Sequence, residues 1–321
     1  MTFPPRLVGD VGGTNARFAL LDEFGVPMTP VTLRVADHPD LVTAIRHFLE
    51  QQARATGERS TGTLHAAAIA VATPVIGDRI KLTNSHWSWS IEETRTALGV
   101  ETLHLVNDFT ALALSVPHLP PDQLDAVGGG APAPGHTKAI IGPGTGLGVS
   151  GLVPCGSGWT ALQGEGGHVT LGGSEAREQA VHAHLSARYP HVSAERFLSG
   201  PGLVNIAQAL CHIDGREPVS WSPADVSRLG LSGEHPCARE ALELFCHLLG
   251  KVAGNLVLTL GAQGGCYIGG GVVPRLGRFF HESRFRAAFE AKGRMSGYLD
   301  RVPTYVIHSP YPALVGAAQL L

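Results

Sequence analysis

The stretch "LVGDVGGTNARFALL", residues 7–21, consists of two apolar runs separated by a glycine-rich turn. This pattern predicts a strand, a tight turn and a second strand. Glycine is ordinary in hairpin turns, so the stretch taken alone is equally consistent with a simple hairpin. A turn does not require a carboxylate, however, and Asp10 lies among the glycines. Asp10 is therefore a candidate functional residue.

A second stretch, "AIIGPGTGLGVSGLV" at residues 139–153, repeats the pattern of apolar run, glycine turn and apolar run. Both turns carry a threonine beside the glycines, Thr14 in the first and Thr145 in the second. Successive backbone N–H groups without Cβ atoms form a concavity that binds anions, and a threonine hydroxyl adds one more donor. Two such turns, one near the start of each half of the chain, predict that a polyphosphate is held by two related lobes.

Two other phosphate-binding motifs fit the sequence poorly. Residues 146–151, "GLGVSG", match the dinucleotide fingerprint GxGxxG, but the residues that follow do not form a helical pattern. That fingerprint requires a helix directly after the glycines. The P-loop pattern is absent, because Gly250 and Lys251 precede a valine instead of Ser or Thr. Bound phosphate would therefore be held by the hairpin turns.

Size and composition indicate a two-lobed α/β protein. The chain has 321 residues, of which 44% are hydrophobic, and this length favours two lobes over one. Strand patterns alternate with helical patterns, which is typical of the α/β class. Residues 117–135 are rich in Pro and Gly and read as a loop or lobe boundary. We expect a small domain of residues 1–110 plus 308–321 and a large domain of residues 111–307.

The net charge and the cysteine content limit which partners and which cellular compartment we expect. The net charge is −3 with no basic tract, so we expect no nucleic-acid partner. We find neither a signal peptide nor an apolar run of membrane-spanning length, so we expect no membrane partner. The five cysteines form no CxxC pair, which favours a reducing compartment and cysteines used mostly as small core residues. The expected location is cytoplasmic.

Three local patterns predict how helices begin. A helix is expected over residues 37–54 with Pro39 in its first turn. A short helix should follow Ser90 as its cap and stop at Gly99. Ser193 is expected to cap a helix that contains Glu195, for which the simplest interpretation is a solvated helix face.

Asp10 and the pair Asn107–Asp108 each allow two interpretations. A carboxylate beside a phosphate cradle repels the ligand unless a cation intervenes, so Asp10 suits Mg²⁺; it also suits an Asx turn that bonds its own backbone. Asn107 and Asp108 follow an apolar strand, where either could simply cap a helix. A carboxylate at the carboxyl end of a strand could also take a proton from a hydroxyl that attacks phosphorus.

Glu165 and His168 lie in the glycine-rich loop "LQGEGGHVTLGG", residues 162–173. The glycines disfavour the helix that would place both side chains on one face, and no nearby CxC or CxxC completes a zinc site. Contact with a polar ligand is the better interpretation. Acidic, amide and imidazole side chains without a cluster of Arg or Lys suit a neutral polyol and would repel an anionic substrate.

The motifs closely resemble those of the bacterial glucokinases outside the ROK branch, within the hexokinase–actin–Hsp70 ATPase superfamily. The matching stretches span the chain in family order: "LVGDVGGTNARFAL", "TNSHWSWSI", "VNDFTALALSVP", "GPGTGLGV", "GEGGHV", "HVSAERFLSGPGLVN", "GKVAGNLVLTLGAQGG", "IGGGVVPR" and "FRAAFEAKGR". The cysteine-rich zinc signature of the ROK branch does not follow His168, so that zinc site is not expected.

The resemblance implies two ribonuclease H-like lobes around a central cleft, with ATP on the glycine turns and the sugar between the lobes. Asp108 resembles the general base for the 6-hydroxyl of the sugar. The residues that resemble hexose ligands are Asn84, Asn107, Asp108, Glu165, His168 and Glu195. The residues that resemble the nucleotide-binding turns are Gly9, Asp10, Val11, Gly12, Gly13 and Thr14, then Gly144, Thr145 and Gly146, and on the adenosine side Gly269, Gly270 and Gly271. Asp10 would face Mg²⁺ through water.

The activity that the resemblance implies is transfer of the γ-phosphoryl group of ATP to the 6-hydroxyl of glucose, a step of glycolysis, by a cytoplasmic homodimer. A kinase for another hexose, such as mannose or fructose, is the alternative among enzymes. A sugar sensor without catalysis would not need Asp108, and a regulator usually carries a DNA-binding segment. An actin- or Hsp70-like ATPase that acts on protein partners would not need the stretches around His168 and Glu195.

Overall fold

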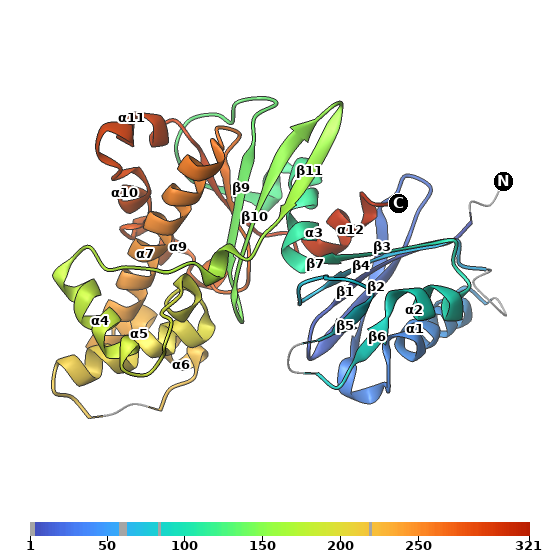
Figure 1. Cartoon of the computed structure of the whole chain (residues 1–321), viewed down its shortest axis with the longest axis horizontal. Helices are drawn as coiled ribbons and strands as arrows, with labels where there is room; N and C mark the ends of the chain where they lie inside the picture. The colour runs from blue at the N-terminus through green and yellow to red at the C-terminus, as the bar shows by residue number, and fades with distance from the viewer. Residues whose placement is uncertain (1–3, 58–62, 83–84, 218–219) are drawn as a thin grey trace. The chain divides into compact units, whose positions relative to one another are not determined.

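The computed structural model describes residues 4–57, 63–82, 85–217 and 220–321. They belong to two compact units, coloured along the chain in Figure 1. Unit 1 comprises Met1–Leu119 and Ser309–Leu321, and unit 2 comprises Pro120–His308. The chain therefore enters unit 2 within the Pro/Gly-rich stretch, and its last helix belongs to unit 1.

Unit 1 is built on a five-stranded sheet in the order β3-β2-β1-β4-β7. The strands are β1 (Arg6–Val11), β2 (Asn15–Leu21), β3 (Pro27–Arg34), β4 (Ala66–Val71) and β7 (Thr102–Asn107). The predicted hairpin is present, because β1 pairs antiparallel with β2. Strands β1, β4 and β7 run parallel, and all six residues of the central strand β4 are buried. A strand buried on both faces explains the unbroken apolar run "AAAIAV".

Helices cover both faces of this sheet. Helices α1 (Leu41–Thr56) and α2 (Ile91–Leu98) belong to the same apolar core as Phe18 of β2, whereas α3 (Asp108–Ser115) and α12 (Pro312–Ala318) pack on the side of Val8. A short hairpin of β5 (Arg79–Lys81) and β6 (Ser88–Ser90) precedes α2.

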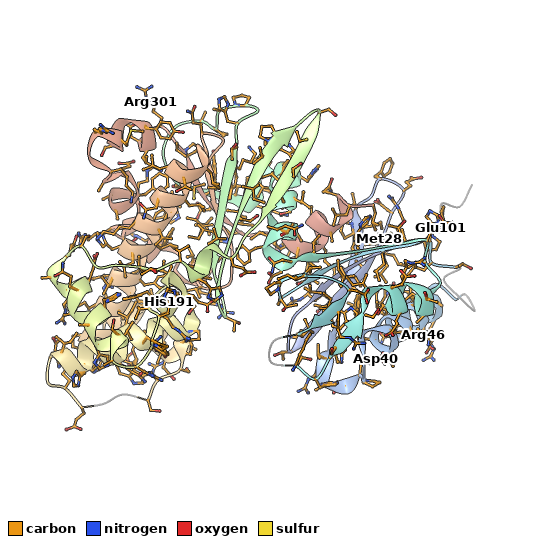
Figure 2. The ribbon with its side chains drawn as sticks, viewed as in Figure 1. Met28, Asp40, Arg46, Glu101, His191 and Arg301 are labelled. Atoms are coloured by element: carbon orange, nitrogen blue, oxygen red, sulfur yellow. The ribbon has the colours of Figure 1, made fainter. Side chains whose placement is uncertain are left out.

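The predicted start of α1 is wrong, and the predicted ends of α2 are confirmed. Pro39 lies before α1, and the cap is Asp40, whose carboxylate accepts a hydrogen bond of 2.7 Å from the Thr43 N–H (Figure 2). An aspartate caps better than a proline two residues before the helix, because its oxygen satisfies one of the unpaired N–H groups of the first turn. Ser90 caps α2 and Gly99 ends it in the left-handed conformation.

Unit 2 contains a six-stranded sheet in the order β11-β10-β9-β12-β13-β8. The strands are β8 (Leu124–Gly128), β9 (Lys138–Pro143), β10 (Leu147–Cys155), β11 (Gly158–Gln163), β12 (Cys266–Ile268) and β13 (Thr304–Ile307). Strand β8 lies inside the stretch predicted to be a loop. It is an edge strand, and the strand that pairs with it among the described residues is β13, which runs antiparallel to it about 180 residues later in the sequence (Val306 pairs with Asp125). Its own residues alternate too little to predict it.

Unit 2 also contains most of the helices: α4 (Ala176–Ser186), α5 (Gly200–Ile213), α6 (Pro223–Ser232), α7 (Pro236–Leu260), α8 (Val273–Leu276), α9 (Arg278–Glu282), α10 (Phe285–Glu290) and α11 (Ser296–Leu299). Among the described residues, α7 is the helix with the length and composition to cross a membrane. However, 72% of its most apolar stretch is buried within the protein, as in a core helix. Four of the five cysteines are buried free thiols, and Cys155 is exposed.

The predicted cap at Ser193 is wrong. Glu195 lies in a single 3₁₀ turn, Ala194–Arg196, to which the Ser193 side chain donates or accepts no capping bond. The following α-helix, α5, begins at Gly200 with Ser199 as its cap and Pro201 in its first turn. The pattern Ser-Gly-Pro carries both helix-start signals, a capping hydroxyl and a proline at the second helical position, and so it prevails over Ser193.

Candidate active site

The carboxyl ends of the three parallel strands of unit 1 bring the first glycine turn and Asp108 to one edge. Val11 of β1 is aligned with Val71 of β4, and Val71 is aligned with Asn107 of β7. Neighbouring strands are about 4.8 Å apart, so the turn after Val11 and the residues after Asn107 are separated by roughly 10 Å along this edge. Ligands of open α/β sheets bind outside the carboxyl ends of the strands.

The first glycine turn presents backbone donors at this edge. Gly12 closes the turn by donating to the carbonyl of Asn15 at 2.9 Å. No backbone or side-chain acceptor within the described residues takes the N–H groups of Gly13 and Thr14, and Thr14 is exposed. These N–H groups and the Thr14 hydroxyl are therefore available to an anion. Gly9, by contrast, is buried inside β1 between β2 and β4.

Asp10 lies in strand β1, two residues before the turn, and is paired across the hairpin with Arg17 of β2. The Arg17 Nη1 donates to Asp10 Oδ2 at 3.0 Å. Burial raises the pKa of Asp10, and Arg17 offsets part of this rise. The Asx-turn interpretation does not fit, because Asp10 is a strand residue whose carboxylate bonds Arg17. Alternation along β1 places Asp10 on the same face as Val8, the face covered by α3 and α12.

Asn107 and Asp108 are fixed by the start of α3. The Asn107 side-chain oxygen accepts from the Phe109 N–H at 2.9 Å, so Asn107 does cap the helix. Its amide also donates to the carbonyl of Thr73 at 3.4 Å, which ties β7 to the loop after β4. Asp108 is half-buried, and its Oδ1 accepts from the same Phe109 N–H at 2.9 Å. The first turn of a helix favours a negatively charged side chain at this position.

The second and third glycine turns lie side by side in unit 2. Strands β9 and β12 are parallel neighbours, and each ends in one of these turns. The Gly269 N–H donates to the carbonyl of Ile141 at 2.9 Å, and the Val272 N–H donates to the carbonyl of Pro143 at 3.1 Å. Thr145, Gly270 and Gly271 are exposed beside these bonds.

Glu195 is held against the second turn. Its Oε2 accepts from the Leu147 N–H at 2.9 Å, directly after Gly146. A Cβ atom at Gly146 would lie 2.4 Å from the same carboxylate oxygen, so only glycine leaves room for it. The Gly200 N–H, at the start of α5, donates to the carbonyl of Gly144 at 2.8 Å. Glu195 is thus part of a bonded cluster, and the interpretation as a solvated helix face is wrong.

Glu165 and His168 are exposed, and the segment that carries them packs against Leu147, the first residue of β10. A Cβ atom at Gly167 would lie 2.0 Å from the carbonyl oxygen of Leu147, so the loop "GEGGH" must approach β10 through glycine. The His191 ring, labelled in Figure 2, bonds the carbonyl of His168 at 2.9 Å. This bond and the contact between the two 3₁₀ turns bring Glu165 and His168 beside the Glu195 segment.

Within each unit, the predicted site residues that the structure describes lie near one another. Asn84 lies outside the described residues. The structure also adds two partners that sequence reasoning missed, Arg17 beside Asp10 and the Leu147 N–H beside Glu195. The first partner could have been predicted from the hairpin register, because Asp10 and Arg17 are equally many residues from the centre of the turn and therefore lie opposite each other. The second joins residues 48 positions apart and has no local signal.

Comparisons with known proteins agree on one family. A family profile described as Glucokinase matches residues 7–321. The chain is 55% identical over 314 residues to a glucokinase of Chromobacterium violaceum, covering 98% of this chain and 88% of that protein. It is similar to the crystal structure of a glucokinase from an Antarctic psychrotroph, with a TM-score of 0.87, 35% identity and coverage of 100% and 99% of the two chains.

The fold extends to the ROK branch. A ROK family glucokinase from Streptomyces griseus, solved in complex with glucose and AMPPNP, has a TM-score of 0.64 at 19% identity, covering 98% of both chains. At this identity the likeness concerns the fold, which is that of the two-lobed actin- and hexokinase-type kinases.

Proposed function

The chain belongs to the glucokinase family and is a glucose-phosphorylating kinase, and we propose that ATP is its phosphoryl donor and Asp108 its general base. The observation that carries this proposal is the position of Asp108 at the sheet edge that also carries the first glycine turn. A carboxylate and a set of unpaired N–H donors at one edge suit a reaction in which a hydroxyl attacks a phosphoryl group.

In the proposed reaction, the 6-hydroxyl of glucose attacks the γ-phosphorus while Asp108 accepts the hydroxyl proton. A bond forms between O6 and phosphorus, and the bond from phosphorus to the β,γ-bridging oxygen breaks, so ADP leaves. Catalysis of this kind depends mainly on positioning and on charge neutralisation. We assign the phosphates to the N–H groups and threonine hydroxyls of the turns at Gly12–Thr14 and at Gly144–Gly146, and the adenosine side to the turn at Gly269–Gly271.

We assign the hydroxyl groups of glucose to Asn107 and Asp108 of unit 1 and to Glu165, His168 and Glu195 of unit 2. These side chains accept and donate hydrogen bonds without adding a positive charge cluster, which suits a neutral polyol. A site that bonds each hydroxyl discriminates strongly against a sugar in which that hydroxyl is missing or misplaced. Selectivity for glucose over mannose or fructose should therefore reside in these residues. The role of Asn84, the homodimer and the cytoplasmic location stay predictions.

Asp10 fits the role of a carboxylate that faces a hydrated Mg²⁺ ion. Mg²⁺ is usually held by one or two carboxylates, waters and phosphate oxygens, and Asp10 supplies one carboxylate beside the phosphate turn. When bound, the ion would neutralise charge on the ATP phosphates. Arg17 holds Oδ2 of Asp10 at 3.0 Å and so fixes the direction of the other oxygen.

The Asp10→Asn variant is expected to need about 10- to 100-fold more Mg²⁺ for half-maximal rate, which is the usual effect of losing an outer-sphere partner of a metal. The measurement is the initial rate at saturating glucose over a Mg²⁺ titration with the ATP concentration held fixed. The control is Arg17→Gln, which breaks the same ion pair and keeps the carboxylate. If both variants changed stability equally and neither changed the Mg²⁺ dependence, Asp10 would be only a partner of Arg17.

A coupled assay tests the donor and the sugar together. Purified protein is given ATP, ADP or polyphosphate with glucose, mannose or fructose in turn, and kcat/KM is measured for each pair. The proposal expects glucose with ATP to give the highest kcat/KM. A higher kcat/KM with ADP or polyphosphate would overturn the assignment of the donor, and a higher value with another hexose would overturn the assignment of Glu165, His168 and Glu195 to glucose.

A further inference from the structure

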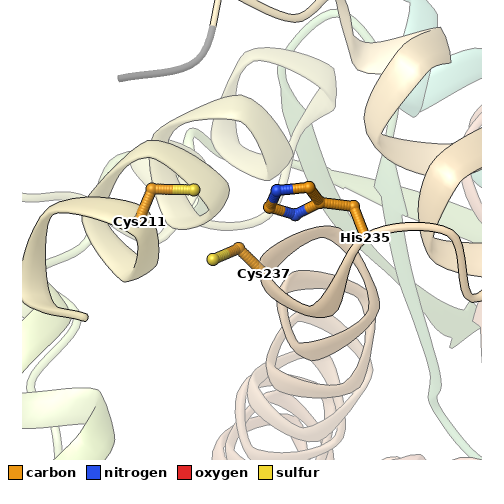
Figure 3. Close-up of side chains that lie close together, drawn as sticks. All are labelled: Cys211, His235 and Cys237. Atoms are coloured by element: carbon orange, nitrogen blue, oxygen red, sulfur yellow. The ribbon is translucent and has the colours of Figure 1, made fainter. Parts of the chain in front are cut away.

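Two thiols and an imidazole meet in unit 2 at a place that the reaction does not use. Cys211 lies in the last turn of α5, His235 directly precedes α7, and Cys237 lies in the first turn of α7. One ligand atom of each residue lies within 4.8 Å of the ligand atoms of the other two. Figure 3 shows the Cys211 thiol pointing toward the imidazole ring, with Cys237 beside them. We call these three residues the Cys–His cluster.

The cluster contains a buried nitrogen without a hydrogen-bond partner. His235 Nδ1 is inaccessible to solvent, and none of the described residues bonds it. The Trp221 ring packs edge-on against the imidazole, with the ring centres 4.6 Å apart, and fixes the orientation of His235. A buried polar atom without a partner destabilises the folded state and is uncommon in native proteins, so this nitrogen points to a ligand.

The two cysteines of the cluster are also buried. Cys211 and Cys237 are each 1% exposed, and the ligand atom of His235 lies within 4.8 Å of both sulfurs. Burial raises the pKa of the Cys211 thiol to about 12, so without a cation the thiol is neutral and unreactive.

A second group of potential ligands in unit 2 also holds buried imidazole nitrogens without a hydrogen-bond partner, both of them on His247, but its carboxylates are paired with cations of the chain. Glu175, Glu178 and His247 also lie close together, but Lys251 bonds Glu178 and Arg284 bonds Glu175. The charges of that group are already balanced by the chain itself. Its ion pairs join α4 to α7. Of the two groups, the Cys–His cluster is therefore the better candidate for a metal site.

We propose that the Cys–His cluster binds one zinc ion, with Cys211, His235 and Cys237 as protein ligands and water in the fourth position. Sulfur and imidazole nitrogen are the ligands that zinc prefers, at roughly 2.3 Å and 2.0 Å. Tetrahedral geometry at these lengths separates the ligand atoms by roughly 3.5–3.8 Å. The ligand atoms lie within 4.8 Å of one another, so each pair needs to approach by about 1.3 Å at most. Rotation of the thiols about their Cα–Cβ bonds provides such movements.

The zinc ion would have a structural role. It would join the end of α5 to the start of α7, which are separated in the sequence by the loop that contains α6. Cys211 lies 11 residues after Gly200, the residue that bonds the second glycine turn, which corresponds to about 16 Å along the helix. At that distance the ion does not contact the ligands assigned to the turn. Zinc should therefore change the stability of unit 2 and leave turnover almost unchanged.

The test is made on the full chain, expressed with zinc and dialysed against a weak chelator. Elemental analysis is expected to find one zinc per chain, and Co²⁺ substitution should give the thiolate-to-cobalt charge-transfer absorption and the visible bands of a tetrahedral site. Stripping the metal should lower the Tm, and readding zinc at about 100 times its Kd should raise it by roughly 5 °C or more. The same readouts are taken on Cys237→Ser and on His235→Gln.

The matched control is Cys246→Ser, which changes an equally buried cysteine of the same helix outside the cluster. This control should keep one zinc per chain, whereas Cys237→Ser and His235→Gln should lose the metal and the zinc-dependent rise in Tm. If Cys237→Ser does not fold, the half-buried His235→Gln decides the question. A wild-type chain without stoichiometric zinc and without a zinc-dependent Tm, or with Cys211 and Cys237 joined in a disulfide, would overturn the proposal.

Discussion

Replacing Asp108 with asparagine is expected to lower kcat for glucose by about 10²- to 10⁴-fold, the usual contribution of a general base. The amide has the same shape as the carboxylate and can still accept the hydrogen bond from the Phe109 N–H, so the start of α3 should be preserved. What the variant loses is the capacity to take the proton of the 6-hydroxyl. The affinity for glucose should stay close to that of the wild type, because a base acts in the transition state.

The measurements are kcat from steady-state kinetics and the Kd of glucose from calorimetry without nucleotide. Asp40→Asn is the matched control, since Asp40 is also an aspartate at a helix start of unit 1, where it caps α1. An asparagine caps almost as well as an aspartate, so Asp40→Asn should leave kcat and stability nearly unchanged. If Asp108→Asn also kept a normal kcat, Asp108 would be only a helix-start residue, and the assignment of the base would be wrong.

The parts of the fold that are visible in the sequence are those set by neighbouring residues. The hairpin of β1 and β2 and the ends of α2 follow from glycine positions, apolar runs and a capping serine within a few residues of each other. Strand β8 is different, because it is defined by pairing with β13, which lies far along the chain. The α-helix in this region begins after Ser199 and not after Ser193. Ser199 is followed by Pro201 in the first turn, which is a helix-start signal that Ser193 lacks.

The candidate site shows the same division. The residue types and the turns can be read from the sequence, but the bonds that orient them cannot. The bond from the Leu147 N–H to Glu195 and the approach of Gly167 to Leu147 both depend on how β10 packs against later segments. The Cys–His cluster is hidden for the same reason, because Cys211 and Cys237 belong to two helices and no spacing motif joins them.

The Gly146→Ala variant is expected to lower kcat/KM for glucose by about 10- to 100-fold. The backbone at Gly146 is one that alanine can adopt, so the substitution adds only a methyl group, and that group would lie 2.4 Å from Glu195 Oε2. The carboxylate must then leave the Leu147 N–H and its assigned place on the sugar. Losing one hydrogen bond to a charged group costs about 1.5–3 kcal/mol, which corresponds to the expected change.

The same methyl group also lies in a turn assigned to phosphate, so a double-mutant cycle with Glu195→Ala is needed to separate the two effects. If Gly146→Ala acts by displacing Glu195, it has nothing left to displace in the Glu195→Ala background and should change kcat/KM there by no more than roughly twofold. If it acts by blocking ATP, its cost should be the same in both backgrounds, together with a raised KM for ATP. Equal costs would show that the Gly146–Glu195 contact does not serve the sugar, whereas a strongly reduced second cost would tie the geometry of the phosphate turn directly to the position of a sugar ligand.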